Sequence, residues 1–98
     1  MDYLLVLAKV EPKMGCQDSI IELSEELISE TLLEEGNIDY QLLKSLKDDT
    51  LTFVEKWQSE EALKKHMRSP HFLNFSEESD EFVEEMTIQV IGAEEISL

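Results

Sequence analysis

The sequence is poor in residues that cross-link or interrupt a chain. Among 98 residues there are one cysteine, two prolines and three glycines. Cys16 has no partner for an internal disulfide and no neighbouring Cys or His at metal-ligand spacing, which excludes zinc sites built on paired cysteines. The prolines and glycines occur singly, so no linker divides the chain, and we expect one domain over residues 1–98.

Basic residues and long apolar runs are also scarce. Eight Lys and Arg stand against 23 Asp and Glu, for a net charge of −15. Nucleic acid and anionic membrane surfaces would be repelled by such a chain, so we expect neither as a partner. No apolar run approaches the roughly 20 residues that span a bilayer, and Asp2 stands where a secretory signal would be basic. The sequence predicts a soluble, cytoplasmic protein.

The first half of the chain predicts a strand and a helix. Residues 3–10 are almost continuously apolar, which is typical of a strand buried on both faces, and Pro12 and Gly15 should end it. Between residues 18 and 35, apolar side chains recur at three- and four-residue steps with glutamates between them. This pattern predicts an amphipathic helix that stops at Gly36, where a left-handed cap suits glycine.

The second half predicts three more strands and short helices. Apolar alternation predicts antiparallel strands at 38–42 and 51–57, joined by an acidic turn, and a last strand at 86–91. Ser59 and the Ser69-Pro70 pair are typical helix starts. They predict short helices near 60–67 and 70–75, and a further helical stretch is expected around 77–84.

The resulting order, β-α-β-β-α-β, predicts an α+β, ferredoxin-like fold. In this fold a four-stranded antiparallel sheet carries its helices on one face. The first strand is apolar on both sides, so the sheet face without helices would present an exposed apolar patch that soluble monomers rarely carry. We therefore expect a homodimer in which a second copy covers that face across a two-fold axis.

One stretch of the sequence resembles the antibiotic biosynthesis monooxygenase (ABM) family. It runs from residue 35 to residue 75 and reads EGNIDYQLLKSLKDDTLTFVEKWQSEEALKKHMRSPHFLNF. The likeness begins with a Glu-Gly turn, a Tyr in the second strand and a Glu-x-Trp motif at the end of the third strand. It continues with a Ser-x-Glu-Ala-Leu helix that is followed by a His, and then with a Ser-x-His-Phe segment. The matching positions are Glu35, Gly36, Tyr40, Glu55, Trp57, Ser59 to Leu63, His66, Ser69, His71 and Phe72.

This resemblance implies a dimeric α+β barrel with a pocket between sheet and helices in each subunit. It also implies one of several chemistries, because members of the family include monooxygenases without metal or flavin, haem-degrading enzymes and a sugar-phosphate isomerase. The positions that haem-degrading members use fall on Ala8, His66 and Ser76, and none of the three matches. No cofactor is therefore expected, and the site must decide the function.

Two histidines are candidates for acid-base chemistry. His66 ends a short helix beside the expected cavity, where an imidazole that titrates near neutrality can take a proton from a phenol or enol. The alternative is a surface histidine that, with Lys64 and Lys65, balances the surrounding acids. His71, one residue after the helix-starting proline, is expected either at the pocket mouth or bonded to the backbone.

Other candidates would bind the substrate. An aromatic wall for a flat ligand is expected from Trp57, Tyr40, Phe53 and Phe72, although aromatic residues on strands are also ordinary core. Glu55 shares the face of Phe53 and Trp57, which indicates a structural ion pair, within the chain or across the dimer, or, less favoured, a catalytic role. Asn37 is expected in the turn after Gly36 or as an amide that contacts the substrate. The acidic runs 22–35 and 77–85 are interpreted as solvated helix faces.

These residues lead to three hypotheses. The first is a cofactor-independent monooxygenase that oxidises a small aromatic, quinol-like substrate with O2, with His66 as the base. The second is an isomerase or other non-redox enzyme acting on a small carbonyl compound, which would need a cationic anchor for phosphate. Its candidates are Lys44, Lys56, Lys64, Lys65 and Arg68. The third is a dimeric binding or stress protein without turnover.

Overall fold

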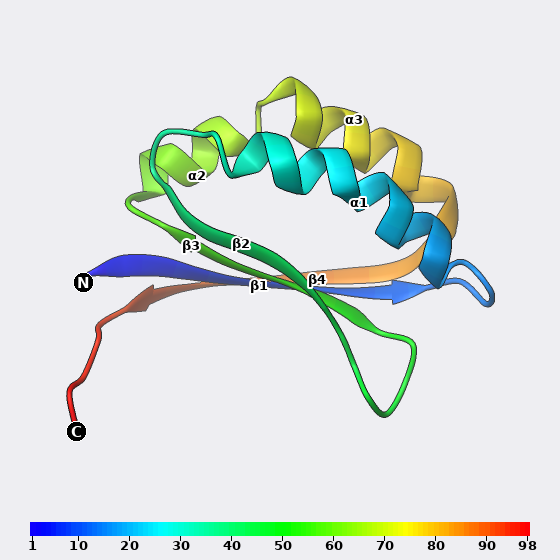
Figure 1. Ribbon diagram of the computed structural model, residues 1–98, viewed down its shortest axis with the longest axis horizontal. Coiled ribbons are helices and arrows are strands. Elements are labelled where there is room, and N and C mark those ends of the chain that lie inside the picture. Colours follow the sequence, from blue (N-terminus) through cyan, green and yellow to red (C-terminus); the bar gives the residue numbers. More distant parts are fainter.

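The computed structural model describes residues 1–98 and confirms the predicted element order (Figure 1). The strands are β1 (Tyr3–Pro12), β2 (Asn37–Lys44), β3 (Leu51–Trp57) and β4 (Val83–Ala93). The helices are α1 (Gln17–Thr31), α2 (Glu60–His66) and α3 (Pro70–Ser79), followed by a 3₁₀ turn at Asp80–Phe82. The sheet order is β2-β3-β1-β4 with every pair antiparallel, which is the α+β ferredoxin-like arrangement.

The three helices lie on the same face of the sheet (Figure 1). Alternate residues of the central strand β1 point towards them and are buried, from Leu4 to Val10, and so are alternate residues of β3, from Leu51 to Trp57. On the opposite face Tyr3, Leu5 and Leu7 are only half-buried. The main core therefore lies between the helices and the β1–β3 half of the sheet. No helix is both long enough and apolar enough to cross a membrane.

Both predicted helix caps are confirmed. The Ser59 side chain accepts a hydrogen bond from the backbone N–H of Ala62 at 3.1 Å, and the Ser69 side chain accepts one from Phe72 at 3.2 Å. Pro70 occupies the first turn of α3, where its missing N–H costs nothing. These caps fix the starts of the two helices that border the site.

The first helix ends earlier than predicted. It stops at Thr31, and residues 32–36 form tight turns in which the N–H of Leu33 and that of Glu34 reach back only three residues. Gly36, with φ of +91°, reverses the chain so that its carbonyl accepts from the N–H of Gln58 at 2.8 Å. The glycine was correctly expected to be left-handed, but it serves a turn into β2 instead of capping the helix directly.

Three further boundaries differ from expectation. The helical stretches expected at 70–75 and 77–84 form one helix to Ser79 plus the 3₁₀ turn, and β4 begins at Val83 instead of residue 86. The earlier start follows from pairing, because Pro12 remains in β1 opposite Val83 beyond a bulge. A second irregularity between Asn37 and Asp39 takes Ile38 out of the alternation, and its side chain is exposed.

Candidate active site

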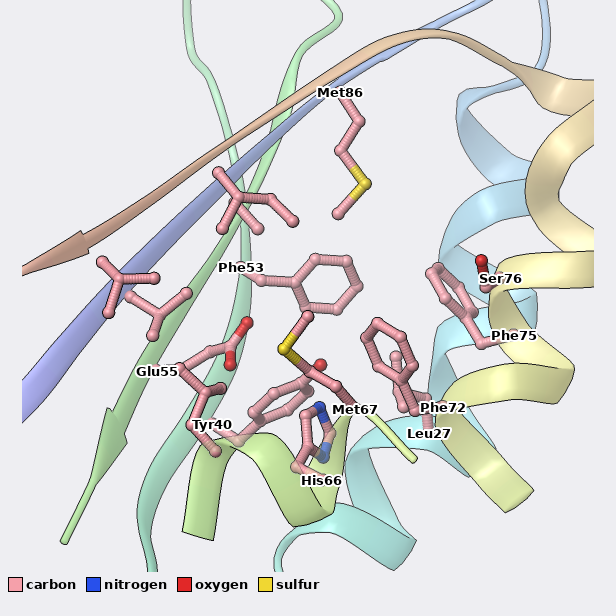
Figure 2. Close-up of a pocket in the computed structure, with 15 residues that line it drawn as sticks. Leu27, Tyr40, Phe53, Glu55, His66, Met67, Phe72, Phe75, Ser76 and Met86 are labelled. Carbon is pink, nitrogen blue, oxygen red and sulfur yellow. The ribbon is translucent and has the colours of Figure 1, made fainter. Parts of the chain in front are cut away.

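A pocket of about 100 Å³ lies between the helix-facing side of the sheet and helices α2 and α3 (Figure 2). Twelve of its 15 lining residues are hydrophobic, and the three polar ones are Glu55, His66 and Ser76. An engineered apolar cavity of about 150 Å³ holds benzene. The pocket is smaller than that cavity, and a mostly apolar lining with a few polar groups is typical of small-molecule sites.

Five of the residues predicted for the site line this pocket: Tyr40, Phe53, Glu55, His66 and Phe72. Figure 2 shows their side chains converging on one space from β2, β3, α2 and α3. Three others, Trp57, Asn37 and His71, are not part of its lining.

Trp57 and Asn37 lie outside the pocket lining. Trp57 is fully buried, its ring centroid lies 4.6 Å from that of His66, and its indole N–H donates to Glu55 Oε1 at 2.9 Å. The Asn37 amide donates to the backbone carbonyls of Asp39 and Lys56, at 3.2 and 3.5 Å. The core holds the Trp57 side chain, as the alternative interpretation predicted, and the strand bulge holds that of Asn37, so neither residue lines the pocket.

His66 is enclosed by aromatic side chains. It is the last residue of α2 and only 1% exposed, so the alternative of a surface histidine is wrong. Its ring centroid lies 5.3 Å from that of Tyr40 and 5.1 Å from that of Phe72. Burial lowers the pKa of His66 below its ordinary value, and the repulsion of His71 acts in the same direction, while Glu34 opposes the shift. Burial therefore favours the neutral imidazole.

A carboxylate outside the predicted site joins the two histidines. Glu34 Oε2 lies 2.6 Å from His66 Nδ1 and 2.8 Å from His71 Nε2. The Glu34 side chain is 14% exposed, so the interpretation of the whole 22–35 run as a solvated face is wrong at this residue. His71 is bonded to this carboxylate and not to the backbone, and it is not among the residues that line the pocket.

The cause of this placement lies in the turn that follows α1. A Cβ added to Gly36 would come within 2.6 Å of the Ala62 Cβ, so only glycine permits the turn to press against α2. The close approach carries Glu34 onto the end of α2, beside His66. The sequence signal for it was the Glu-Gly turn, but that signal names no partner for the carboxylate.

Glu34, His66 and His71 also form a set of donors suited to a metal. Their ligand atoms all lie within 4.8 Å of one another, and two imidazoles with a carboxylate suit zinc or iron. Ligands held about 2.1 Å from a tetrahedral ion would stand roughly 3.3 Å apart. The observed separations of 2.6 and 2.8 Å are those of charge-assisted hydrogen bonds.

Glu55 is a second buried carboxyl group in the pocket wall. It is 5% exposed and has no basic partner within the chain, so a pair with a basic residue across a dimer stays a prediction. Burial raises its pKa to about 7, and the nearby charge of Glu34 adds to the rise while the Trp57 hydrogen bond opposes it. The pKa of Tyr40 is raised by burial and by the charges of Glu55 and Glu34, so its phenol remains protonated.

One polar atom of the site has no partner. The Nε2 atom of His66 is buried without a hydrogen bond, whereas Nδ1 of the same ring is bonded to Glu34. A buried unpaired nitrogen costs about 1–3 kcal/mol, so its presence in a pocket wall requires an explanation.

Comparisons with known proteins agree with the fold. The model of the family "Antibiotic biosynthesis monooxygenase" matches residues 4–78. The curated protein "Putative monooxygenase Rv0793" of Mycobacterium tuberculosis is 31% identical over 70 residues, which cover 71% of this chain and 69% of that protein. "Putative monooxygenase YcnE" of Bacillus subtilis is 30% identical over 76 residues, covering 76% and 78% of the two chains.

Solved structures of similar proteins have the same fold. The structure of Rv0793 superimposes with a TM-score of 0.90 at 25% identity, covering 98% of this chain and 99% of that one. A conserved protein from Methanosarcina mazei superimposes with a TM-score of 0.88 at 34% identity, covering 93% and 92%. The match to the family model spans every element up to α3 and includes most of the residues that form the pocket. The chain therefore belongs to the antibiotic biosynthesis monooxygenase (ABM) family.

Proposed function

We propose that this protein is a cofactor-independent monooxygenase that oxidises a small, quinol-like aromatic compound with O2. The observation that carries the proposal is the unpartnered Nε2 of His66, a neutral buried imidazole in the wall of a largely apolar pocket. Membership of the ABM family and two relatives named as putative monooxygenases support the same reaction class.

In this reaction His66 Nε2 removes the proton of a substrate hydroxyl. The electron-rich anion transfers one electron to O2, and the substrate radical and superoxide combine to form a peroxide at a ring carbon that carries hydrogen. The peroxide takes back the proton from His66 and eliminates water, which leaves a carbonyl at that carbon. One oxygen atom is retained, the other leaves as water with two substrate hydrogens, and no external reductant is needed.

The pocket suits each requirement of this scheme. Its aromatic walls bind a flat ring and exclude the water that would intercept the radical pair. The protonated Tyr40 hydroxyl can donate a hydrogen bond, and the Glu55 carboxyl group, with a pKa of about 7, can accept one from a second substrate hydroxyl. A dihydroxy aromatic therefore matches the polar groups better than a hydrocarbon does.

The two competing functions are less well supported. An isomerase acting on a phosphorylated carbonyl compound needs a cationic anchor, yet no Lys or Arg lines the pocket. A binding protein without turnover would not need a buried imidazole whose Nε2 lacks a hydrogen bond. A hydrogen bond from Nε2 to another group of the protein would be less costly in free energy.

We also propose that the protein acts as a homodimer that pairs the open faces of two sheets. The supporting residues lie on the side without helices, where Leu5 and Leu7 of β1 are half-buried and Ile91 of β4 is 39% exposed. Leu5 stands directly opposite Ile91 in the sheet, so these side chains form one apolar strip.

Oxygen uptake tests the reaction. Wild-type protein and a His66→Ala variant would be incubated with a panel of reduced quinones in an oxygen-electrode cell, with anaerobic samples analysed for product. We expect oxygen-dependent product formation that falls at least about 100-fold in His66→Ala. Lys65→Ala, a change at the exposed neighbouring position, is the matched control and should keep the rate. Equal rates in wild type and His66→Ala, or turnover without oxygen, would contradict the proposal.

Light scattering after gel filtration tests the assembly. We expect twice the chain mass of 11.3 kDa for the wild type and a shift towards the single-chain mass for Leu7→Lys. Met14→Lys introduces the same charge in a fully exposed turn and should leave the mass unchanged. A wild-type protein that remains a single chain at micromolar concentration would contradict the dimer.

A further inference from the structure

We propose that Glu34 is a positioning residue for His66. Its carboxylate fixes the imidazole in the tautomer whose Nε2 is unprotonated and stabilises the ring after that nitrogen has taken a proton. The effect on turnover rests on the proposed monooxygenase function, whereas the effect on the tautomer does not.

The tautomer follows from the hydrogen bond. A carboxylate oxygen accepts hydrogen bonds, so we assign the hydrogen of the 2.6 Å contact with Glu34 Oε2 to His66 Nδ1. Burial favours the neutral ring, which holds one proton in total. The Nε2 atom, which has no partner, is then the basic nitrogen. In Figure 2 the imidazole lies among Tyr40, Met67 and Phe72, at the lining of the pocket.

His71 holds the carboxylate from the other side. Its Nε2 lies 2.8 Å from the same Glu34 oxygen, and its side chain is 15% exposed. It borders two surface hollows on the outside of the helices, one of them lined by Glu26, Glu30, Pro70 and Asn74. A carboxylate between two N–H donors cannot rotate away from His66 without losing both bonds.

The same pair stabilises the protonated state. When His66 Nε2 takes a proton from a ligand, the ring becomes a cation whose Nδ1–H already points at a carboxylate 2.6 Å away. The proton remains on His66, whose Nδ1–H keeps its bond to Glu34 Oε2. The other titratable groups at the ring are His71 of α3 and Tyr40 of β2, and Glu55 of β3 lines the same pocket. Of these, His71 lowers the pKa of His66, so Glu34 is the group that supports the charged ring.

Nitrogen-15 NMR of the histidine rings tests the tautomer without any substrate. Long-range nitrogen–proton correlations distinguish a protonated from an unprotonated ring nitrogen. In wild-type protein at pH 7.5, roughly one unit above the ordinary histidine pKa, we expect His66 to show a protonated Nδ1 and an unprotonated Nε2. In Glu34→Gln the pKa of His66 should fall further, and the proton should shift partly or wholly to Nε2. Glu30→Gln, which removes a charge from an exposed position of α1, should change neither.

Activity gives the second readout. With whichever quinol proves active, kcat of Glu34→Gln should fall at least about 100-fold with a small change in KM, because a wrong tautomer cannot take the proton. His71→Gln keeps an N–H donor for Glu34 and should retain much more activity than His71→Ala. If no quinol is turned over but the tautomer is as stated, the proposed function fails and the role of Glu34 stands.

Two outcomes would overturn the role of Glu34. One is a wild-type His66 protonated at Nε2, or a tautomer that is the same in Glu34→Gln. The other is equimolar binding of Zn²⁺ or Fe²⁺ by wild-type protein that Glu34→Gln abolishes, because the three side chains would then be ligands of a metal. Circular dichroism of each variant checks that the fold is intact before either conclusion is drawn.

Discussion

The β3 side and the β4 side of the pocket differ in how far their side chains are exposed, although both belong to the same face of the same sheet. On the β3 side Trp57 and Phe53 are at most 2% exposed, and aromatic rings pack around His66. On the β4 side, Met86, Ile88 and Val90 line the same pocket and yet are 41–53% exposed. Both sides are apolar, so hydrophobicity does not explain the difference.

The difference comes from where the helices lie. Met86, Ile88 and Val90 stand opposite Val10, Ala8 and Val6 in the sheet, and these three β1 residues are buried under the helices. The covering helices therefore reach across β1 but stop short of β4. The pocket is consequently closed around His66 and open to solvent along β4.

The largest effect that would sharpen this comparison is the loss of Trp57. Trp57→Ala removes a fully buried ring beside His66 and leaves the Glu55 carboxyl group without its donor. We expect the free energy of unfolding to fall by about 3–5 kcal/mol, measured by denaturant titration. Ile88→Ala on the open side should cost only about 1 kcal/mol in a single subunit, because half of the side chain already faces water. Equal losses would show that β4 is covered as fully as β3.

The parts of the fold that could be predicted from the sequence depend on local chemistry. Apolar alternation located all four strands, and Ser59 and Ser69 marked two helix starts correctly, because a cap needs only a side-chain oxygen and an N–H three residues later. Boundaries were predicted less well. The end of α1 and the start of β4 depend on pairing with distant segments, at Gln58 and Pro12, which the local pattern does not contain.

The residues of the candidate site also separate into those that the sequence predicted and one that it did not. Residues that point inward because of strand alternation, such as Tyr40, Phe53 and Glu55, were placed at the cavity from the sequence. Glu34 was not, because its role depends on the turn at Gly36 pressing against α2, which is a contact between residues 26 positions apart in the chain. Within a run of exposed glutamates, the one buried member cannot be distinguished by composition.

A smaller effect is expected from the buried carboxyl group on the closed side. Because burial raises the pKa of Glu55 to about 7, the folded state binds its proton more tightly than the unfolded state, whose pKa is about 4.5. This contribution to stability is complete at low pH and is lost as pH rises towards and through 7. Between pH 4 and pH 8 the loss should reach about 3 kcal/mol. Glu55→Gln keeps an acceptor for Trp57 but does not titrate, so the stability difference between variant and wild type should widen with pH.

Denaturant titrations at pH 5 and pH 8, at one protein concentration, measure that difference. Glu61→Gln, at an exposed position in the first turn of α2, is the control and should show no such widening. A constant difference between Glu55→Gln and wild type across this range would mean that water reaches the carboxyl group. The β3 side of the pocket would then be hydrated, and its contrast with the exposed β4 side would be weaker than the exposed fractions indicate.

The smallest effect concerns how α2 holds His66 in place on the closed side. Ser59→Ala removes the acceptor for the Ala62 N–H, a cap worth about 1 kcal/mol, and should lower the unfolding free energy by that amount. Ser69→Ala should cost somewhat more, because the Ser69 hydroxyl also donates to the backbone carbonyl of His66 at 2.7 Å. Thermal unfolding of the two variants checks the order. A larger loss for Ser59→Ala would mean that the start of α2, and not the turn after His66, sets the position of the imidazole.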